Sequence, residues 1–355
     1  MARPFVSVLI DTYNHETFIE EAIASVFLQD FPASETEILV VDDGSTDRTA
    51  EIAAKFSPRV RVLRKVNGGQ ASAFNAGIPE AQGQIVAFLD GDDWWTPNKL
   101  SKVARVFNSE PEVGLIGHGL TQISADQQQR TEVPREICRY RIRSVGEARQ
   151  FRMQRGFFGT SRMTYRRKLL QEIGPAPETL RFEADEYIFT VAALLTDVLV
   201  LNEALTFYRL HDNNLFQLAD GNVEGARRKQ RVLAALVQAL DNKLTELKVP
   251  EEIAETILES VDLESNALRL RLESGFPWET IATEVRILRA FHSDASVWQH
   301  LFSLARLVPA LVMPARAYYR YRQRLSQGRL YQRIRAKMLP FPVPENVERR
   351  DKPAS

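Results

Sequence analysis

Short β-branched segments alternate with amphipathic segments over the first 120 residues, and this alternation constrains the fold more than any other feature. Short apolar runs bounded by polar residues are typical of buried strands, whereas apolar residues at three- and four-residue spacing are typical of helices. The alternation predicts an α/β fold with a mainly parallel sheet covered by helices on both faces. The expected strands are residues 5–10, 37–43, 59–64, 84–90 and 113–120.

Acidic sequences stand at the carboxyl ends of three of these expected strands. They are DTYN at 11–14, DDGS at 42–45 and DGDD at 90–93. The carboxyl ends of parallel strands meet at one edge of a sheet, where open α/β sheets bind ligands. Asp90, Asp92 and Asp93 would repel one another unless a positive charge lay between them, although a solvated turn is an alternative. Because divalent cations prefer carboxylate oxygens, we favour one site that holds a cation.

The composition argues against several classes of protein. Lys plus Arg and Asp plus Glu both number 46, so the chain has no net positive charge that would favour binding to nucleic acid. The single cysteine, Cys138, excludes an internal disulfide and suits a reducing compartment. The segment nearest to a membrane span, residues 301–313, is too short and contains Arg306 and Pro309. With no signal-peptide pattern at the start, we expect a cytoplasmic protein without a transmembrane helix.

The pattern changes near residue 220, where it becomes helical throughout. The sequence ADGN marks a break, and we place a domain boundary near residues 218–222. The expected organisation is therefore an α/β domain at 1–218 and a helical C-terminal region at 219–355. Within the first domain, residues 121–218 are less regular than residues 1–120.

Five segments form an ordered set of motifs. They are VSVLIDTYNHETFIEEAIASVFLQDF, EILVVDDGSTDRTAEI, NGGQASAFNAGIPEAQGQIVAFLDGDDWW, FEADEY and YRLHDNN. Together they resemble glycosyltransferase family 2 over about residues 5–215. The resemblance implies a GT-A fold, a nucleotide-sugar donor and a divalent metal cofactor, Mn²⁺ or Mg²⁺. It also implies a nucleotide-sugar-binding half at 1–120 and an acceptor half at 121–218.

The Asp-x-Asp motif of this family matches Asp90-Gly91-Asp92. By resemblance, Asp92 binds the metal, and through it the diphosphate, while Asp90 reaches the ribose. Gly91 lets the backbone approach closely without a side-chain clash. Asp93 is assigned instead to capping the helix that begins around Pro97.

The resemblance assigns the nucleotide to residues after the first two strands. Tyr13 lies against the base with Asp11 close by, and Asp43 contacts the edge of a uracil or thymine, which implies a UDP- or dTDP-sugar. Phe74 stands where many relatives carry Arg, which removes one phosphate contact. Asn75 remains as a polar contact to the donor, with helix packing as its alternative role.

The base that deprotonates the acceptor hydroxyl is assigned by the family's Glu-Asp motif, which aligns with Ala184-Asp185. Asp185 is the expected catalytic base, and the reaction inverts the anomeric carbon. The preceding Glu is absent, so Glu186 offers a rival register, and helix capping is a further alternative. His211 matches a recurring family histidine that contacts the metal or the diphosphate, unless it is only structural.

The C-terminal part of the chain is basic. Between Asp294 and Glu345 there are nine Lys and Arg residues and no acid, with Tyr and aliphatic residues between them. A helix formed by this segment would suit the surface of an anionic membrane, although it would also suit packing on its own domain or on a partner. Nucleic acid is disfavoured because no binding module accompanies the charge.

These features predict an inverting, metal-dependent glycosyltransferase that modifies a glycan or lipid-linked glycan in cell-surface polysaccharide synthesis, at the inner face of the plasma membrane. A sugar-phosphate nucleotidyltransferase is an alternative, but DTYNHE stands where its Gly-rich, basic signature belongs. A non-catalytic nucleotide-sugar-binding module, recruiting partners through the helical region, is the other alternative. Retention of Asp92 and Asp185 argues against it.

Overall fold

The computed structural model describes residues 5–211, 223–273, 276–291, 304–305 and 307–327. The chain divides into two compact units, residues 1–265 and 266–355, and each unit is described by itself. The domain boundary expected near residues 218–222 lies outside the described residues and stays a prediction.

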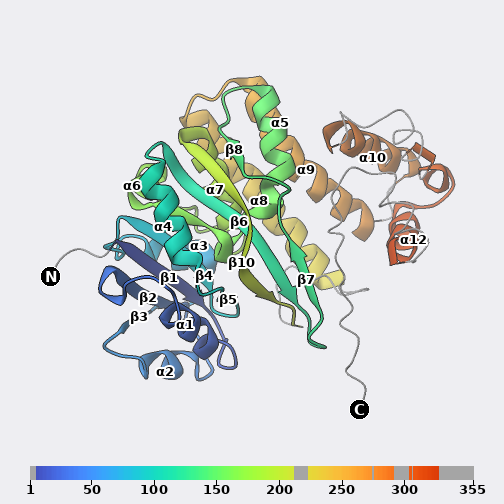
Figure 1. Cartoon of the computed structure of the whole chain (residues 1–355). Coiled ribbons are helices and arrows are strands. Elements are labelled where there is room, and N and C mark those ends of the chain that lie inside the picture. Colours follow the sequence, from blue (N-terminus) through green and yellow to red (C-terminus); the bar gives the residue numbers. More distant parts are fainter. Residues whose placement is uncertain (1–4, 212–222, 274–275, 292–303, 306, 328–355) are drawn as a thin grey trace, which may run out of the picture. The chain divides into compact units, whose positions relative to one another are not determined.

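A ten-stranded mixed sheet forms the centre of the first unit (Figure 1). Its order is β3-β2-β1-β4-β9-β6-β10-β5, with β7 paired to β6 and β8 paired to β10. The longer pairings, among β1, β2, β3 and β4 and between β6 and β10, are parallel. The strands are β1 (Val6–Thr12), β2 (Thr36–Asp42), β3 (Val60–Arg64), β4 (Ile85–Asp90), β5 (Trp94–Trp95), β6 (Val113–Ile123), β7 (Gln129–Glu132), β8 (Cys138–Tyr140), β9 (Thr164–Arg166) and β10 (Asp197–Arg209). All five expected strands are present, and the expected α/β architecture is confirmed.

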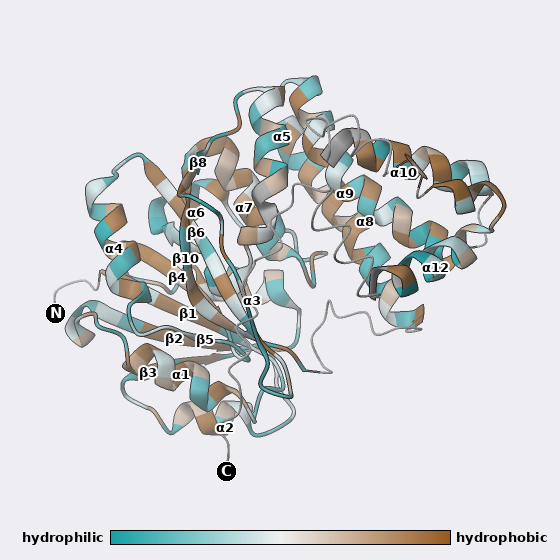
Figure 2. Cartoon of the chain, turned by 45° about the vertical axis from the view of Figure 1, so that its right-hand side comes forward, coloured by the Kyte–Doolittle hydropathy of each residue, from teal (hydrophilic) through white to brown (hydrophobic). Residues whose placement is uncertain are grey.

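Helices cover both faces of this sheet. On one face, α1 (Ile19–Phe27), α2 (Thr49–Ala54) and α4 (Lys99–Ser109) share a core with Val6, Val8 and Ile10 of β1. The opposite face carries α3 (Gln70–Gly77), whose Gly77 lies against Leu9 and Val41. On this second face α3 contacts α7 (Ala184–Leu195), which in turn contacts α6 (Arg167–Ile173). The strands are mainly hydrophobic and the helices are of mixed polarity (Figure 2), as expected for a sheet buried on both faces.

The register of the central strands brings the acidic sequence motifs together. In the β1–β4 pair, Asp11 lies opposite Asp90, and in the β1–β2 pair Thr12 lies opposite Asp42. Parallel strands that end at the same level place their last side chains at one edge of the sheet. We call this the carboxyl edge.

The first unit continues into helices beyond the sheet. They are α5 (Val145–Gln154), α8 (Val223–Glu246) and the part of α9 (Glu251–Leu272) that precedes residue 266. The α8 helix packs on α7, and Lys229 of α8 forms an ion pair with Glu264 of α9 at 2.7 Å. No helix among the described residues is long and apolar enough to cross a membrane.

The second unit is helical in its described part. It contains α10 (Pro277–Phe291), the 3₁₀ turn η4 (Val308–Leu311) and α12 (Ala315–Gln327). Leu307, Ala310 and Tyr318 form a small core against α10. Arg322 of α12 forms an ion pair with Glu284 of α10. Residues 328–337 of the expected basic tail lie outside the described residues.

One buried cation fixes a loop of the first unit. Lys99 is completely buried, and its Nζ lies 3.6 Å from the centre of the Trp95 ring. The same Nζ donates to the carbonyl oxygen of Ser161 at 2.8 Å, although burial lowers the pKa of Lys99 well below its usual value. Trp95 and Thr206 also donate to this carbonyl, at 2.9 and 2.7 Å. Three donors from three elements thus hold the loop around Ser161 against the sheet.

Lys99→Ala should reduce the free energy of unfolding by about 2–4 kcal/mol, because it leaves a cavity beneath Trp95 and removes one of these three hydrogen bonds. Urea denaturation followed by circular dichroism measures the change. Lys102→Ala on the same helix is the matched control, since Lys102 forms a partly exposed ion pair with Glu203. It should cost less than about 1 kcal/mol. Equal losses in the two variants would contradict the role of Lys99.

Candidate active site

A cavity of about 1280 Å³ lies at the carboxyl edge of the sheet, entirely within the first unit. Its walls come from the ends of β1 and β4, the loop at 67–70, the loop at 156–162, the start of α7 and one side of α8. It lies where ligands bind in open α/β sheets. Of the predicted site residues, those that line it are Asp11, Tyr13, Asp43, Asp90, Asp92, Asp185 and His211.

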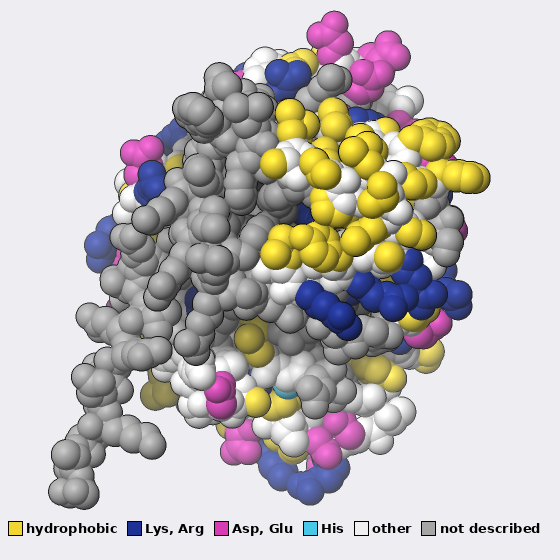
Figure 3. Space-filling model, turned by 90° about the vertical axis from the view of Figure 1, so that its right-hand side faces the viewer, with side chains coloured by type: hydrophobic (Ala, Val, Ile, Leu, Met, Phe, Trp, Pro, Cys, Tyr) yellow, Lys and Arg dark blue, Asp and Glu magenta, His cyan; other side chains and the backbone are white. Residues whose placement is uncertain are grey.

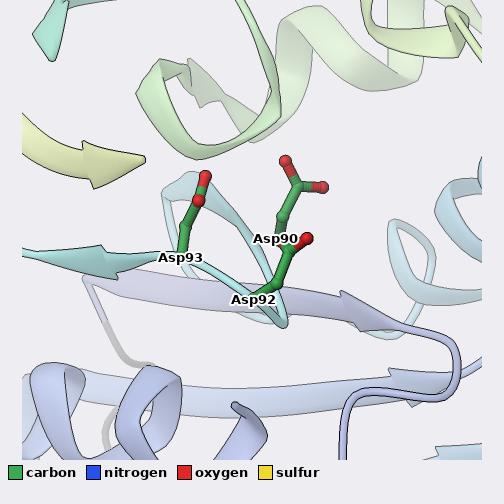
Figure 4. A group of neighbouring side chains, drawn as sticks. All are labelled: Asp90, Asp92 and Asp93. Carbon is green, nitrogen blue, oxygen red and sulfur yellow. The ribbon is translucent and has the colours of Figure 1, made fainter. Parts of the chain in front are cut away.

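Three carboxyl groups lie at the end of β4 and on the short loop that follows it. Asp90, Asp92 and Asp93 leave this loop on the same side (Figure 4), and one oxygen of each lies within 4.8 Å of the others. The loop packs closely against β1, since a Cβ at Gly91 would come 2.5 Å from Oγ1 of Thr12. The close approach that the sequence predicted for Gly91 is therefore present. Asp93 accepts from the backbone N–H of Arg209 at 3.1 Å and does not cap the α4 helix.

Two histidines approach Asp92. Nε2 of His211 lies 3.0 Å from Oδ2 of Asp92, and Nε2 of His15 lies 3.8 Å from the same oxygen. Burial opposes ionisation of Asp92, but the hydrogen bond to His211 and the nearby His15 bring its pKa below the ordinary value. His15 is a site residue that sequence reasoning missed, although it directly follows the DTYN motif.

The other acids of this edge lack such partners. Burial raises the pKa of Asp11 and Asp90 well above the ordinary value, and neighbouring carboxylates add to the effect. Burial, followed by the charge of Asp92, raises the pKa of Asp93 to about 8. Oδ1 of Asp11 is buried without a hydrogen-bond partner among the described residues. The edge therefore concentrates buried carboxyl groups whose ionisation is opposed by burial and by one another.

This donor set fits a hard divalent cation. Carboxylate oxygens are the ligands that Mg²⁺ and Mn²⁺ prefer, and a cation would supply positive charge that stabilises the ionised carboxylates. Asp90, Asp92 and Asp93 have the spacing to hold it, with His211 beside Asp92.

The nucleotide-facing residues behave differently from one another. Tyr13 is 44 % exposed at the cavity wall, so its ring is available for stacking. The carboxylate of Asp43 is instead occupied by the following loop. It accepts from Lys65 Nζ at 2.7 Å and from the backbone N–H groups of Gly68 and Gly69 at 3.0 and 2.7 Å. In this geometry Asp43 positions the glycine loop, and its contact with a base stays a prediction.

Asn75 stands apart from the cavity. Its side-chain amide donates to the carbonyl oxygen of Ala176 and accepts from the N–H of the same residue, both at 2.8 Å. These bonds tie α3 to the segment before α7, which is the helix-packing role left open by the sequence. Phe74 is fully buried and packs edge-on against Phe88, which explains an apolar residue at this position.

Asp185 lies in the first turn of α7, and hydrogen bonds orient both of its carboxyl oxygens. Oδ2 accepts from the N–H and the hydroxyl of Thr160 at 3.1 and 3.2 Å, and Oδ1 accepts from the N–H of Glu186 at 2.8 Å. Burial raises the pKa of Asp185, which these hydrogen bonds partly oppose. A carboxylate with a raised pKa, held in one orientation, is suited to accept a proton.

Hydrogen bonds of Gln70, at the start of α3, help to hold Thr160 and the start of α7 beside Asp185. Gln70 donates to Oγ1 of Thr160 at 2.9 Å and accepts from the N–H of Ala184 at 2.9 Å. Glu183, just before α7, has a left-handed backbone with φ +60°, which is costly for a non-glycine residue and is often found at functional sites. Sequence reasoning missed Gln70 and Thr160, because both act through contacts between distant segments.

The α8 helix also contributes to the cavity, although the sequence placed it in a separate C-terminal region. Arg228, Lys229, Arg231 and Val232 line the wall, with Glu264 beside Lys229. This wall is mainly basic, whereas the carboxyl edge is acidic. No sequence motif indicated it.

Comparison with known proteins identifies the family. The family model described as Glycosyl transferase family 2 matches residues 7–174. An uncharacterized glycosyltransferase of Nostoc sp. is 33% identical over 254 residues, which cover 68% of this chain and 76% of the relative. The chain belongs to glycosyltransferase family 2. This glycosyltransferase is also 33% identical over 225 residues to the uncharacterized glycosyltransferase EpsJ of Bacillus subtilis, covering 61% of the chain and 64% of EpsJ.

Solved structures support the GT-A fold of this glycosyltransferase. S. aureus TarS 1-349, in complex with UDP-GlcNAc, superposes with a TM-score of 0.58 at 21% identity and covers 89% of this chain and 91% of its own. The mannosyltransferase PcManGT from Pyrobaculum calidifontis, in complex with GDP-Man and Mn²⁺, gives a TM-score of 0.54 at 19% identity, covering 94% and 84%. Membership of the family removes the nucleotidyltransferase alternative, and the glycosyltransferase relatives support an enzyme over a non-catalytic module.

Asp92→Asn should weaken Mn²⁺ binding by at least about 100-fold, because it removes the negative charge of the carboxylate expected to bind the metal, whereas loss of an outer-shell partner costs about 10- to 100-fold. Isothermal titration calorimetry with Mn²⁺ and UDP measures the affinity. Asp241→Asn, an exposed acid on α8, is the charge-matched control and should bind as the wild type does. Unchanged Mn²⁺ affinity in Asp92→Asn would place the metal elsewhere.

Proposed function

We propose that this glycosyltransferase is an inverting, divalent-metal-dependent enzyme that moves a sugar from a UDP- or dTDP-sugar to a glycan or lipid-linked glycan acceptor, in cell-surface polysaccharide synthesis. One observation carries the proposal. A single cavity holds a carboxylate cluster that fits a cation and, on a different element, the separately oriented Asp185. An inverting transferase requires a leaving-group clamp and a base as two distinct groups.

The carboxyl edge would act on the leaving group. A bound Mn²⁺ or Mg²⁺ supplies positive charge to the diphosphate as the bond to the sugar breaks. Asp92, with Asp90 and Asp93, would hold the cation, and Asp90 would also reach the ribose. Ser161 steadies Asp90, since its hydroxyl accepts from the N–H of Asp90 at 3.0 Å and lies 3.3 Å from Oδ2.

Asp185 would accept the proton of the acceptor hydroxyl. As that oxygen forms its bond to the anomeric carbon, the bond between this carbon and the diphosphate breaks, and the diphosphate leaves with the electron pair. Attack from the side opposite the leaving group inverts the carbon. Thr160 fixes Oδ2 of Asp185, while the remaining lone pairs of the carboxylate can face the substrate. Such general-base assistance is worth roughly 10²- to 10⁴-fold.

The donor would lie between Tyr13 and the loop held by Asp43. Tyr13 offers an exposed aromatic face to the base, and Asp11 offers a carboxylate nearby. TarS, crystallised with UDP-GlcNAc, supports a uridine nucleotide, whereas PcManGT, crystallised with GDP-Man and Mn²⁺, supports the metal but a different base. The choice of UDP or dTDP for this chain rests on the family resemblance at Asp43, which implies a uracil or thymine base, and on the UDP-GlcNAc complex of TarS.

The acceptor would approach from the wall formed by α8. The cavity is larger than the roughly 300–1,000 Å³ of typical ligand sites, which leaves room for two substrates. Arg228 and Val232 on this wall offer one cationic and one apolar surface to a glycan or lipid-linked glycan. For a lipid-linked acceptor, the enzyme would work at the inner face of the plasma membrane, in peripheral contact with anionic lipid.

UDP- or dTDP-sugars with Mn²⁺ should raise the melting temperature of the protein, while GDP-sugars should not. A thermal-shift panel of nucleotide-sugars, each with Mn²⁺ and with EDTA, measures the effect. The stabilisation follows from binding to the folded state alone and is about 2.7 kcal/mol at a donor concentration of 100 Kd. A response to GDP-mannose alone would overturn the choice of base, and shifts unaffected by EDTA would overturn the metal dependence.

Asp185→Asn should reduce sugar transfer about 10²- to 10⁴-fold and leave donor binding unchanged, because an amide cannot take the proton. Release of UDP from a donor identified in that panel, including its slow hydrolysis by water, reports turnover without a known acceptor. Glu186→Gln tests the rival register and should retain most of the activity. Full turnover by Asp185→Asn would exclude Asp185 as the base, and loss of turnover in Glu186→Gln alone would move the base to Glu186.

A further inference from the structure

The second unit exposes an unusual amount of hydrophobic surface. Among the described residues, seven of the thirteen exposed large hydrophobic side chains lie between residues 276 and 321. Val312 is 81 % exposed, and Phe276 and Trp278 are 67 % and 66 % exposed. The seven are Phe276, Trp278, Leu304, Val308, Leu311, Val312 and Tyr321. Single exposed apolar residues are normal, but a gathering of them marks an interaction surface.

The second unit has a core of its own, so the exposure of these side chains does not come from the absence of one. The η4 turn has two sides: Leu307 and Ala310 are buried in the core of the second unit, whereas Val308 and Leu311 point outward. The outward side of a short turn normally carries polar residues. Here it carries aliphatic ones, followed by the nearly fully exposed Val312.

A row of arginines accompanies this surface. Arg316, Arg320 and Arg324 are exposed and follow one another at four-residue spacing, so they lie along one side of α12. Arg322 instead faces α10, where it pairs with Glu284. No acidic residue occurs in α12, and the three arginines have no acidic partner among the described residues.

Figure 3 shows the side of the molecule that carries α10 and α12. Hydrophobic side chains gather over one broad area, and Lys and Arg side chains line one of its borders. We call this combination of the seven hydrophobic side chains with Arg316, Arg320 and Arg324 the apolar–basic surface.

We propose that the apolar–basic surface docks the second unit onto an anionic lipid bilayer. Amphipathic elements of this kind place aliphatic and aromatic side chains at the boundary of headgroups and acyl chains, while basic side chains contact lipid phosphates. Trp278 and Tyr321 are the residue types that favour this boundary. The arginine side chains are attracted to the negative surface potential, and each is expected to strengthen binding about fivefold.

Charge favours a bilayer over a second copy of the chain. Two copies that met through this surface would bring their arginine rows together, and like charges across an interface oppose association. An anionic bilayer offers both an apolar phase for Leu311 and Val312 and phosphates for Arg316, Arg320 and Arg324. The proposal deepens the membrane contact stated under Proposed function, and it rests on this described surface rather than on residues 328–355.

Sedimentation of the full chain with lipid vesicles tests the proposal. The vesicles are phosphatidylcholine alone, or phosphatidylcholine with phosphatidylglycerol. The wild type should bind the anionic vesicles and not the neutral ones, and added salt should weaken binding. The triple variant Arg316→Gln, Arg320→Gln, Arg324→Gln should lose roughly 100-fold in vesicle affinity. At high salt, where the charge contribution is screened, the double variant Leu311→Ser, Val312→Ser should also lose roughly 100-fold in vesicle affinity relative to the wild type.

Matched controls come from the first unit. Arg105→Gln, Arg149→Gln, Arg227→Gln removes the same charge from exposed positions, and Leu28→Ser with Val66→Ser removes exposed apolar side chains. Both controls should bind vesicles as the wild type does. Donor hydrolysis should be unchanged in every variant, so loss of vesicle binding is distinguishable from failure of the proposed catalytic function.

Four results would overturn the proposal. Wild-type vesicle binding by the arginine variant would exclude the row on α12, and equal losses in the charge-matched control would reduce the effect to net charge. Loss of binding only when the chain is truncated after residue 327 would assign the membrane contact to the tail. Conversion of a dimer to a monomer by Leu311→Ser, Val312→Ser, without change in vesicle binding, would assign the surface to self-association.

Discussion

The pairing of Asp11 with Asp90 across β1 and β4 is the constraint on which the rest of the site depends. Two buried carboxyl groups at one level of a parallel sheet repel each other, and burial raises the pKa of both. Shifting the register by one residue would turn these side chains to opposite faces of the sheet. The fold therefore carries an electrostatic cost where carboxyl groups gather at one edge, and the proposed divalent cation would offset this cost.

The loop at 160–161 connects the two ends of the site. The hydroxyl of Ser161 contacts Asp90 at the donor end, and the neighbouring Thr160 holds Asp185. The carbonyl of Ser161 is in turn held by donors from three elements, among them Lys99. Adjacent residues of one loop thus contact both the proposed leaving-group clamp and the proposed base. Burial disfavours the charged form of Lys99, and this cost is understandable because Lys99 helps to hold rigid a loop that contacts both ends of the site.

Local sequence patterns predicted the strands that open the chain and the acids that follow them, because a buried strand and its carboxyl end are written in consecutive residues. They did not predict the short antiparallel pairings of β5 and β9, which join segments distant in the chain. The same reason hides Gln70 and Thr160, whose roles exist only through contacts with α7. It also hides Arg228, since nothing in a regular helical pattern reveals which side of α8 lines a cavity. Asn75 illustrates the converse, because a motif position that suggested ligand contact serves to join two segments.

A formal net charge of zero conceals a strong separation of charge along this chain. The acids of the carboxyl edge are buried and converge on one cavity, whereas the arginines of α12 are exposed and spread along a helix. Buried charge of one sign favours a compact ion of the opposite sign, because the low dielectric strengthens a short-range interaction. Exposed charge beside apolar surface favours an extended partner, since each contact is weak and only their sum gives affinity. The two arrangements therefore suit the two kinds of partner that we propose for this chain, a small cation and a broad anionic surface.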